Sequence, residues 1–157
     1  MKKKRVVIIF LLLLLVSVIG ISSYFLFKDK INLLDVDHSA VDWNGKKQKD
    51  TSGEENTIAI PGFEKVTLYA NETKQVVNFH NPEINDCYFK ISLVHPDGSV
   101  LWISDLIEPG KGMYSIELEK TLAVGEYENA VLKYECFSLN DQSPLNGSEI
   151  NLKLVVV

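Results

Sequence analysis

Charged and apolar positions separate sharply in the first 30 residues. An unbroken apolar run of 22 residues covers positions 6–27, with four cations at positions 2–5 before it and Lys28 after it. A helix needs roughly 20 apolar residues to cross a membrane, so the run predicts a single transmembrane helix. Because Lys and Arg are enriched on the cytoplasmic side, we expect residues 1–5 to form a basic cytoplasmic stub. The C-terminal part of the chain is then extracellular.

A cleaved secretory signal is the alternative interpretation of the same run. Its apolar region would span only about 7–15 residues and would end at a small-x-small cleavage site. The run in this chain continues through Tyr24 to Phe27, past the poor candidate sites around Gly20. We therefore expect an uncleaved signal-anchor in the cell membrane. The remaining residues are exported in either case, and a cleaved chain would be secreted.

Residues 28–56 show neither helical nor strand periodicity. Charged and small polar residues dominate, and too little apolar surface is present to offset the entropy of ordering. We predict a flexible acidic linker over this range. Trp43 is the exception, and either packs locally or rests near the membrane.

From residue 57 onward, short runs of β-branched and aromatic residues alternate with turn signals. The run at 87–95 is the clearest, because Cys87, Phe89, Ile91 and Leu93 share one face by period two. Strands are predicted at 65–70, 75–80, 87–95, 100–104, 113–120, 126–138 and 149–157. Seven strands at this spacing predict an all-β, immunoglobulin-like β-sandwich over residues 57–157.

The distribution of charge limits the range of partners. The chain carries a formal net charge of −5, but residues 1–30 alone carry +5, which leaves −10 for the exported part. That part contains no Arg. Nucleic-acid binding depends on Lys and Arg that neutralise phosphates, so we expect no nucleic-acid partner.

Both cysteines lie in the exported part. In an immunoglobulin-type sandwich the third and sixth predicted strands are antiparallel neighbours, and the start of one lies beside the end of the other. Cys87 opens the third strand and Cys136 closes the sixth, each on the apolar face. We expect a disulfide between them, because exported proteins retain such bridges. The alternative is two separate buried thiols.

A resemblance appears at the start of the sixth strand. Leu122, Gly125 and Tyr127 resemble the Leu-x-x-Gly-x-Tyr pattern of fibronectin type III-like and bacterial immunoglobulin-like domains. The resemblance implies a tyrosine corner, in which the Tyr127 hydroxyl bonds back to the chain. Tyr134-Glu-Cys136 is similar to the end of the same strand in true immunoglobulin domains. Tyr127 and Tyr134 have opposite parity, so both face inward only if a β-bulge separates them.

Residues 57–157 also resemble a group of short membrane-anchored proteins of Gram-positive bacteria. The similarity rests on Ile60-Pro-Gly-Phe63 and on Tyr134-Glu-Cys136-Phe137. It implies no activity, because the group has none assigned.

Catalytic and metal-binding patterns are missing from the sequence. We find no Gly-x-Ser-x-Gly, His-Glu-x-x-His or Gly-x-Gly-x-x-Gly motif, and we expect no catalytic residue, metal or cofactor. His80, His95 and Asp97 would form a metal site only if separate loops brought them together. Trp102 lies on a short strand that we expect at the edge of a sheet, where it either anchors a partner or packs into the core.

These observations favour a non-enzymatic surface module that is held at the membrane by one helix and binds another protein. The alternative is a structural accessory subunit of an envelope transfer or secretion assembly. Exchanging the helix for an unrelated one separates the two hypotheses, because only the assembly subunit depends on the identity of its helix. An enzyme is the third and least favoured hypothesis.

Overall fold

The computed structural model describes residues 33–45 and 57–157, and every regular element in these ranges is a β-strand. The strands are β1 (Val41–Asp42), β2 (Lys65–Leu68), β3 (Lys74–His80), β4 (Cys87–Val94), β5 (Val100–Ile103), β6 (Lys111–Glu117), β7 (Gly125–Ser138) and β8 (Pro144–Val156). The predicted cytoplasmic stub at 1–5 and helix at 6–27 lie outside the described residues. Within the described ranges, no helix is long and apolar enough to cross a membrane.

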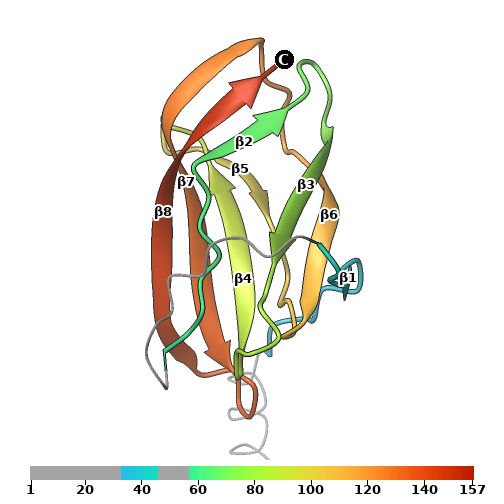
Figure 1. Ribbon diagram of the computed structural model, residues 1–157, viewed down its shortest axis with the longest axis vertical. Helices are drawn as coiled ribbons and strands as arrows, with labels where there is room; N and C mark the ends of the chain where they lie inside the picture. The colour runs from blue at the N-terminus through green and yellow to red at the C-terminus, as the bar shows by residue number, and fades with distance from the viewer. Residues whose placement is uncertain (1–32, 46–56) are drawn as a thin grey trace, which may run out of the picture. The chain divides into compact units, whose positions relative to one another are not determined.

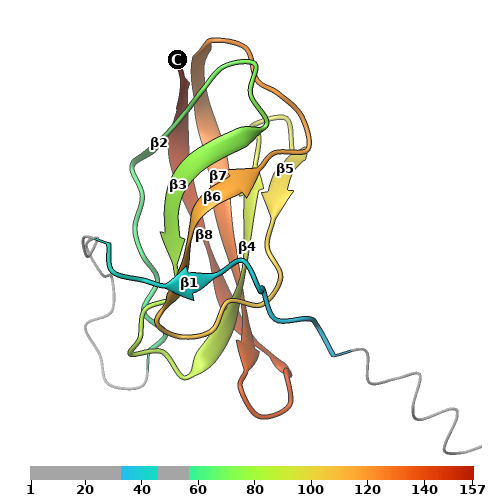
Figure 2. The ribbon, with the colours of Figure 1, turned by 90° about the vertical axis from the view of Figure 1, so that its right-hand side faces the viewer.

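The strands form two sheets that face each other (Figures 1 and 2). The smaller sheet has the order β1-β6-β3, and the larger has the order β2-β8-β7-β4-β5. Neighbouring strands are antiparallel except β2 and β8, which run parallel. The two-sheet β-sandwich that the sequence predicts is therefore confirmed.

Each of the seven predicted strands overlaps an observed one. The largest difference is at β8, which begins at Pro144 rather than at 149. Its early residues pair with the end of β7 across a bulge that contains Gly147. A Cβ at Gly147 would lie 2.3 Å from the Tyr134 carbonyl oxygen, so only glycine fits. Asn, Pro and Gly in this stretch predicted a loop because such residues are equally typical of turns.

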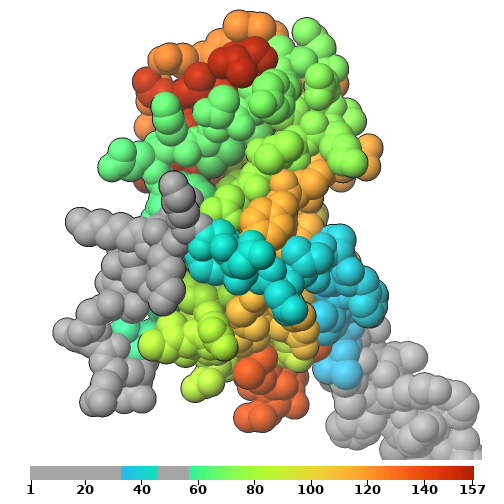
Figure 3. Space-filling model, turned by 45° about the vertical axis from the view of Figure 1, so that its right-hand side comes forward, coloured from blue at the N-terminus to red at the C-terminus, as the bar shows by residue number. Residues whose placement is uncertain are grey.

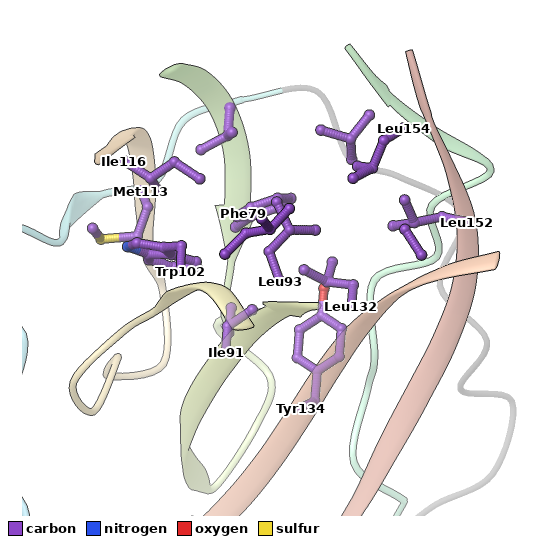
Figure 4. Packing of buried hydrophobic residues seen from close by; sticks show 14 of the residues in the cluster. Phe79, Ile91, Leu93, Trp102, Met113, Ile116, Leu132, Tyr134, Leu152 and Leu154 are labelled. Carbon is purple, nitrogen blue, oxygen red and sulfur yellow. The ribbon is translucent and has the colours of Figure 1, made fainter. Parts of the chain in front are cut away.

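The core fills the space between the two sheets (Figure 4). On β4 the period-two pattern holds, because Phe89, Ile91 and Leu93 are all fully buried. Phe79 of the smaller sheet stacks with Trp102 of the larger, with ring centroids 5.8 Å apart. Trp102 is only 7% exposed and belongs to the core. Of the two alternatives for Trp102, packing into the core is the one that the structure shows, because the indole is turned inward.

A β-bulge separates Tyr127 from Tyr134 on β7, which is the condition under which both side chains can face inward. The register with β8 shifts between Tyr127 and Ala130, where β7 contains one extra residue. Asn129 at this position has a φ of 61°, in the left-handed region that Asn tolerates better than most residues. The shift changes the parity of the strand, so Tyr127 packs against the core while Tyr134 is fully inside it.

The expected disulfide is not formed. Cys87 and Cys136 are free thiols in the structure, each 1% exposed. The register pairs Cys136 with Phe89 and Cys87 with Ser138, so the cysteines are offset by two residues rather than directly opposite. A hydrogen bond with Cys136 lowers the pKa of the Cys87 thiol, and the same bond together with burial raises that of Cys136.

The structure also moves the start of the folded domain. Residues 34–45, which were predicted to belong to the flexible linker at 28–56, form one compact unit with 57–157. We call residues 34–45 the N-terminal strap. In Figure 3 the strap (blue to cyan) lies across the surface of the sandwich, and its strand β1 extends the smaller sheet beyond β6. The remaining linker residues, 28–32 and 46–56, lie outside the described ranges.

Candidate functional site

The N-terminal strap is attached to the sandwich mainly through backbone groups. At its start, the Leu34 N–H donates to Oε1 of Gln142 (2.6 Å), and Nε2 of Gln142 donates to the Leu34 carbonyl (3.0 Å). Farther along, the Asp37 N–H donates to the Leu106 carbonyl (2.8 Å). Two residues of β1 then pair with Lys111 and Gly112 of β6. Because backbone pairing needs no apolar periodicity, the sequence of the strap resembles that of a linker.

Trp43 is the main side-chain anchor of the strap. Its indole stacks on the imidazole of His80, with ring centroids 3.7 Å apart and an interplanar angle of 8°. Nε1 of Trp43 donates to Oδ1 of Asn78 (2.7 Å), at the place where the β3–β6 register shifts. Gly112 makes room for the ring, since a Cβ there would lie 2.7 Å from Trp43 Cδ1. The position of the indole therefore depends on residues from both neighbouring strands.

A groove of about 820 Å³ opens beside this anchor. It is larger than two other hollows on the surface, of about 470 and 340 Å³. Its lining combines residues 42–45 of the strap with Pro61, His80, the β3–β4 turn at 82–84 and the β5–β6 turn at 109–110. Prolines contribute at three positions, Pro61, Pro82 and Pro109. Ile84 on the rim is 79% exposed, so an apolar side chain lies open to solvent beside the indole.

The electrostatics of the groove are set by two carboxylates and a neutral histidine. Asp42 forms an ion pair with Lys111 (2.6 Å), and this contact holds the pKa of the Asp42 carboxyl below its usual range. Glu83 forms no ion pair within the described part of the chain. No Lys or Arg is among the described residues that line the groove. The surface that these described residues give the groove is therefore apolar and acidic.

His80 forms part of the groove wall and is 4% exposed. Burial lowers its pKa to about 4, although a hydrogen bond with the backbone of Asn78 partly opposes the shift. Its Nδ1 atom is buried and has no hydrogen-bond partner among residues 33–45 and 57–157. His80 is thus neutral at pH 7, and protonating it requires either breaking the stack with Trp43 or placing a charge in an apolar environment.

The other candidate residues do not assemble into a reactive site. His95 contacts Asp97, with Nδ1 and Oδ1 2.9 Å apart, and hydrogen bonds from Ser99 hold the Asp97 pKa well below its usual range. His80 does not join them, because β3 and β4 finish at opposite ends of the sandwich (Figure 1). No group of His, Cys, Asp or Glu able to hold a metal occurs among residues 33–45 and 57–157.

The corner residues have a structural role in the fold. The Tyr127 hydroxyl donates to the Ala123 carbonyl (2.9 Å), which is the bond expected of a tyrosine corner. Leu122 is buried in the core. The Tyr127 ring lies close to Gly125, since a Cβ at that glycine would be 3.7 Å from the ring. These three residues fix the crossing from one sheet to the other, and none of them lines the groove.

Sequence reasoning missed most of the groove. Trp43 was noticed as an apolar exception in a polar stretch, but nothing in its neighbours predicted which strand it would contact. Asn78 and Gly112 carried no signal at all, because their roles arise only when β1, β3 and β6 are side by side. The most useful available signal was the tryptophan itself, since an indole rarely stays in water.

Comparison with known proteins adds no assignment. No protein-family model, no curated protein and no solved structure matches this chain.

Proposed function

We propose that this chain is a membrane-anchored, non-enzymatic binding module that docks a protein partner in the groove beside Trp43. The observation that carries the proposal is the groove itself. Binding sites are typically concave and mainly apolar with a few polar groups, and this one combines an indole, prolines and an exposed isoleucine with two carboxylates. Loops at one end of a rigid sandwich present such a surface at little entropic cost.

The sandwich is of the immunoglobulin-like type. The strand order supports this assignment, because β4, β7 and β8 occupy the places of strands C, F and G, with β5 added at the edge. In the other sheet β3 and β6 correspond to strands B and E. The position of strand D beside strand E is taken by β1, which comes from the strap instead of from the chain between β5 and β6.

The anchor is the apolar segment at 6–27, with the N-terminus in the cytoplasm and the sandwich extracellular. Its length and its basic flank support this topology. Alkaline extraction should leave the chain in the membrane fraction. Protease added to intact cells should degrade the sandwich. Release of the chain by alkali would indicate a cleaved signal and a secreted protein.

The binding role is tested by photo-crosslinking on intact cells. A photoreactive amino acid replaces Ile84 on the groove rim in one variant and Val124 in the control. Val124 is 72% exposed and immediately precedes β7, at the opposite end of the sandwich from the β3–β4 turn (Figure 1). We expect a discrete crosslinked product from position 84 and none from position 124. Equal products from both positions, or none from position 84, would contradict docking in the groove.

A further inference from the structure

We propose that the occupant of the groove is a polypeptide segment that carries apolar side chains next to Lys or Arg. The inference rests on the proposed function and names the chemistry of the partner. Three properties of the groove support it: the sign of its charge, the composition of its walls, and the strand at its edge.

The charged residues that line the groove within the described part of the chain favour a cationic partner over an anionic one. Glu83 and Asp42 are the charged residues among those that line it, and Asp42 is already paired with Lys111. His80 adds no positive charge at neutral pH because its pKa is lowered to about 4. Glu83 therefore faces the groove as an anion without an ion-pair partner among residues 33–45 and 57–157. A cation of the partner gains a favourable contact there, whereas a phosphate or carboxylate would be repelled.

The walls of the groove select apolar side chains. The indole of Trp43, the three prolines and Ile84 supply the apolar part of the lining, and proline has no backbone N–H to offer. Burying Ile84 under a partner removes an apolar side chain from water, which favours association. A strongly hydrated, purely cationic segment would leave this surface uncovered.

The edge of the smaller sheet favours a polypeptide over a small organic cation. β1 is the outermost strand of the order β1-β6-β3, and it has no partner strand on its outer side among the described residues. Asp42 belongs to β1 and also lines the groove. An extended segment that lies in the groove can therefore pair its backbone with β1 while its side chains contact the walls, as in other strand-addition complexes.

The test uses the full chain in phosphatidylcholine nanodiscs and two synthetic probes. One probe is a short peptide of leucine, proline and lysine, and the other has glutamate in place of each lysine. The chain has two tryptophans, Trp43 on the groove and Trp102 in the core. Binding should change the emission of Trp43 in a saturable way and protect it from acrylamide, while empty nanodiscs measure contact of the peptide with lipid.

Calorimetry then compares variants with the wild-type chain. Glu83→Gln should weaken binding of the lysine peptide by roughly threefold, the scale of one solvent-exposed ion pair. Ile84→Ser should weaken it by roughly tenfold through lost apolar contact, without touching the hydrogen bonds of the strap. Glu149→Gln is the matched control, because it removes one carboxylate from β8 in the other sheet. Its affinity should equal that of the wild type.

Equal binding of the glutamate peptide, an equal loss in the Glu149→Gln control, or no saturable response would overturn the assignment of the partner's chemistry. A crosslink from position 84 on cells together with failure of the lysine peptide would leave the docking site intact and reject only this chemistry. Failure of both experiments would reject the binding module as well.

Discussion

Replacing His80 by phenylalanine should reduce the loss of stability that the domain suffers in mild acid. His80 is 4% exposed and stacked under Trp43, and burial holds its pKa at about 4, compared with about 6.5 for a histidine in an unfolded chain. Phenylalanine keeps a ring for the stack and removes the titrating group. It also removes Nδ1, which has no hydrogen-bond partner in the part of the chain that the structure describes.

The direction of the effect follows from proton binding. Above pH 6.5 His80 is neutral in both the folded and the unfolded chain, so its contribution to the free energy of unfolding is constant. Between pH 6.5 and 4 the unfolded chain takes up a proton that the folded chain does not, and acidification therefore favours unfolding. For these two pKa values the loss is about 2 kcal/mol at pH 5 and about 3 kcal/mol once both forms are protonated.

The assay is urea unfolding of the full chain in detergent, followed by tryptophan fluorescence at several pH values between 4.5 and 7.5. The wild type should lose about 2 kcal/mol more stability than His80→Phe between pH 7.5 and pH 5. Depressed carboxyl pKa values, as at Asp42 and Asp97, also reduce stability in acid, but they act at lower pH and are common to both proteins. The difference between the two curves therefore isolates His80.

Acid should also loosen the N-terminal strap before the sandwich unfolds. Detaching the strap exposes His80 to water, and protonation favours whichever state solvates it. Acrylamide should quench the fluorescence of Trp43 more strongly at pH 5 than at pH 7.5, while the core residue Trp102 stays protected. Parallel stability curves for wild type and His80→Phe, with quenching that does not change with pH, would refute the reasoning.

Three further predictions concern the backbone and the cysteines. Gly112→Ala should displace the strap indole and increase acrylamide quenching, because the new Cβ would lie 2.7 Å from it, whereas Gly125→Ala meets only ordinary contacts and should leave quenching unchanged. Tyr127→Phe should lower the free energy of unfolding by about 1 kcal/mol through loss of the corner hydrogen bond, and an unchanged urea midpoint would show that the bond contributes nothing. Cys87 and Cys136 of the folded, reduced chain should not react with a thiol reagent because each is 1% exposed. When the chain is denatured without prior reduction, two thiols per chain should react with the reagent. If no thiol reacts in the denatured chain, the two cysteines form a bridge.

The strands of the sandwich could be predicted because each has its own local pattern. Alternation along β4 identifies its buried face without reference to any other strand, and the Pro96-Asp97-Gly98 turn marks where it ends. The antiparallel pairing of β4 with β7 also followed from the expected architecture. The parity of Tyr127 and Tyr134 indicated only that a bulge would be needed for both to face inward, and the pairing of β7 with β8 decided that the bulge lies before Ala130.

The register between strands could not be read in the same way. Cys87 and Cys136 were expected opposite each other. The observed register between β4 and β7 offsets them by two residues, which is enough to separate the two thiols. Trp102 was ambiguous for a related reason, since a short edge strand leaves the direction of an indole open. Its place in the core is decided by Phe79 on the opposite sheet.

The amino-acid sequence by itself determines an apolar segment of membrane-spanning length, an acidic remainder of the chain and a set of strands with defined inward faces, because these are properties of composition and of period-two alternation. The tertiary structure decides where the N-terminal strap docks and places Trp43 against His80 and Gly112. Because the strap residues line the groove, it thereby also decides the groove. The strap is held mainly by backbone hydrogen bonds and by one indole, and backbone groups are the same in every residue. The sequence therefore gives almost no information about which sheet edge such a segment will pair with.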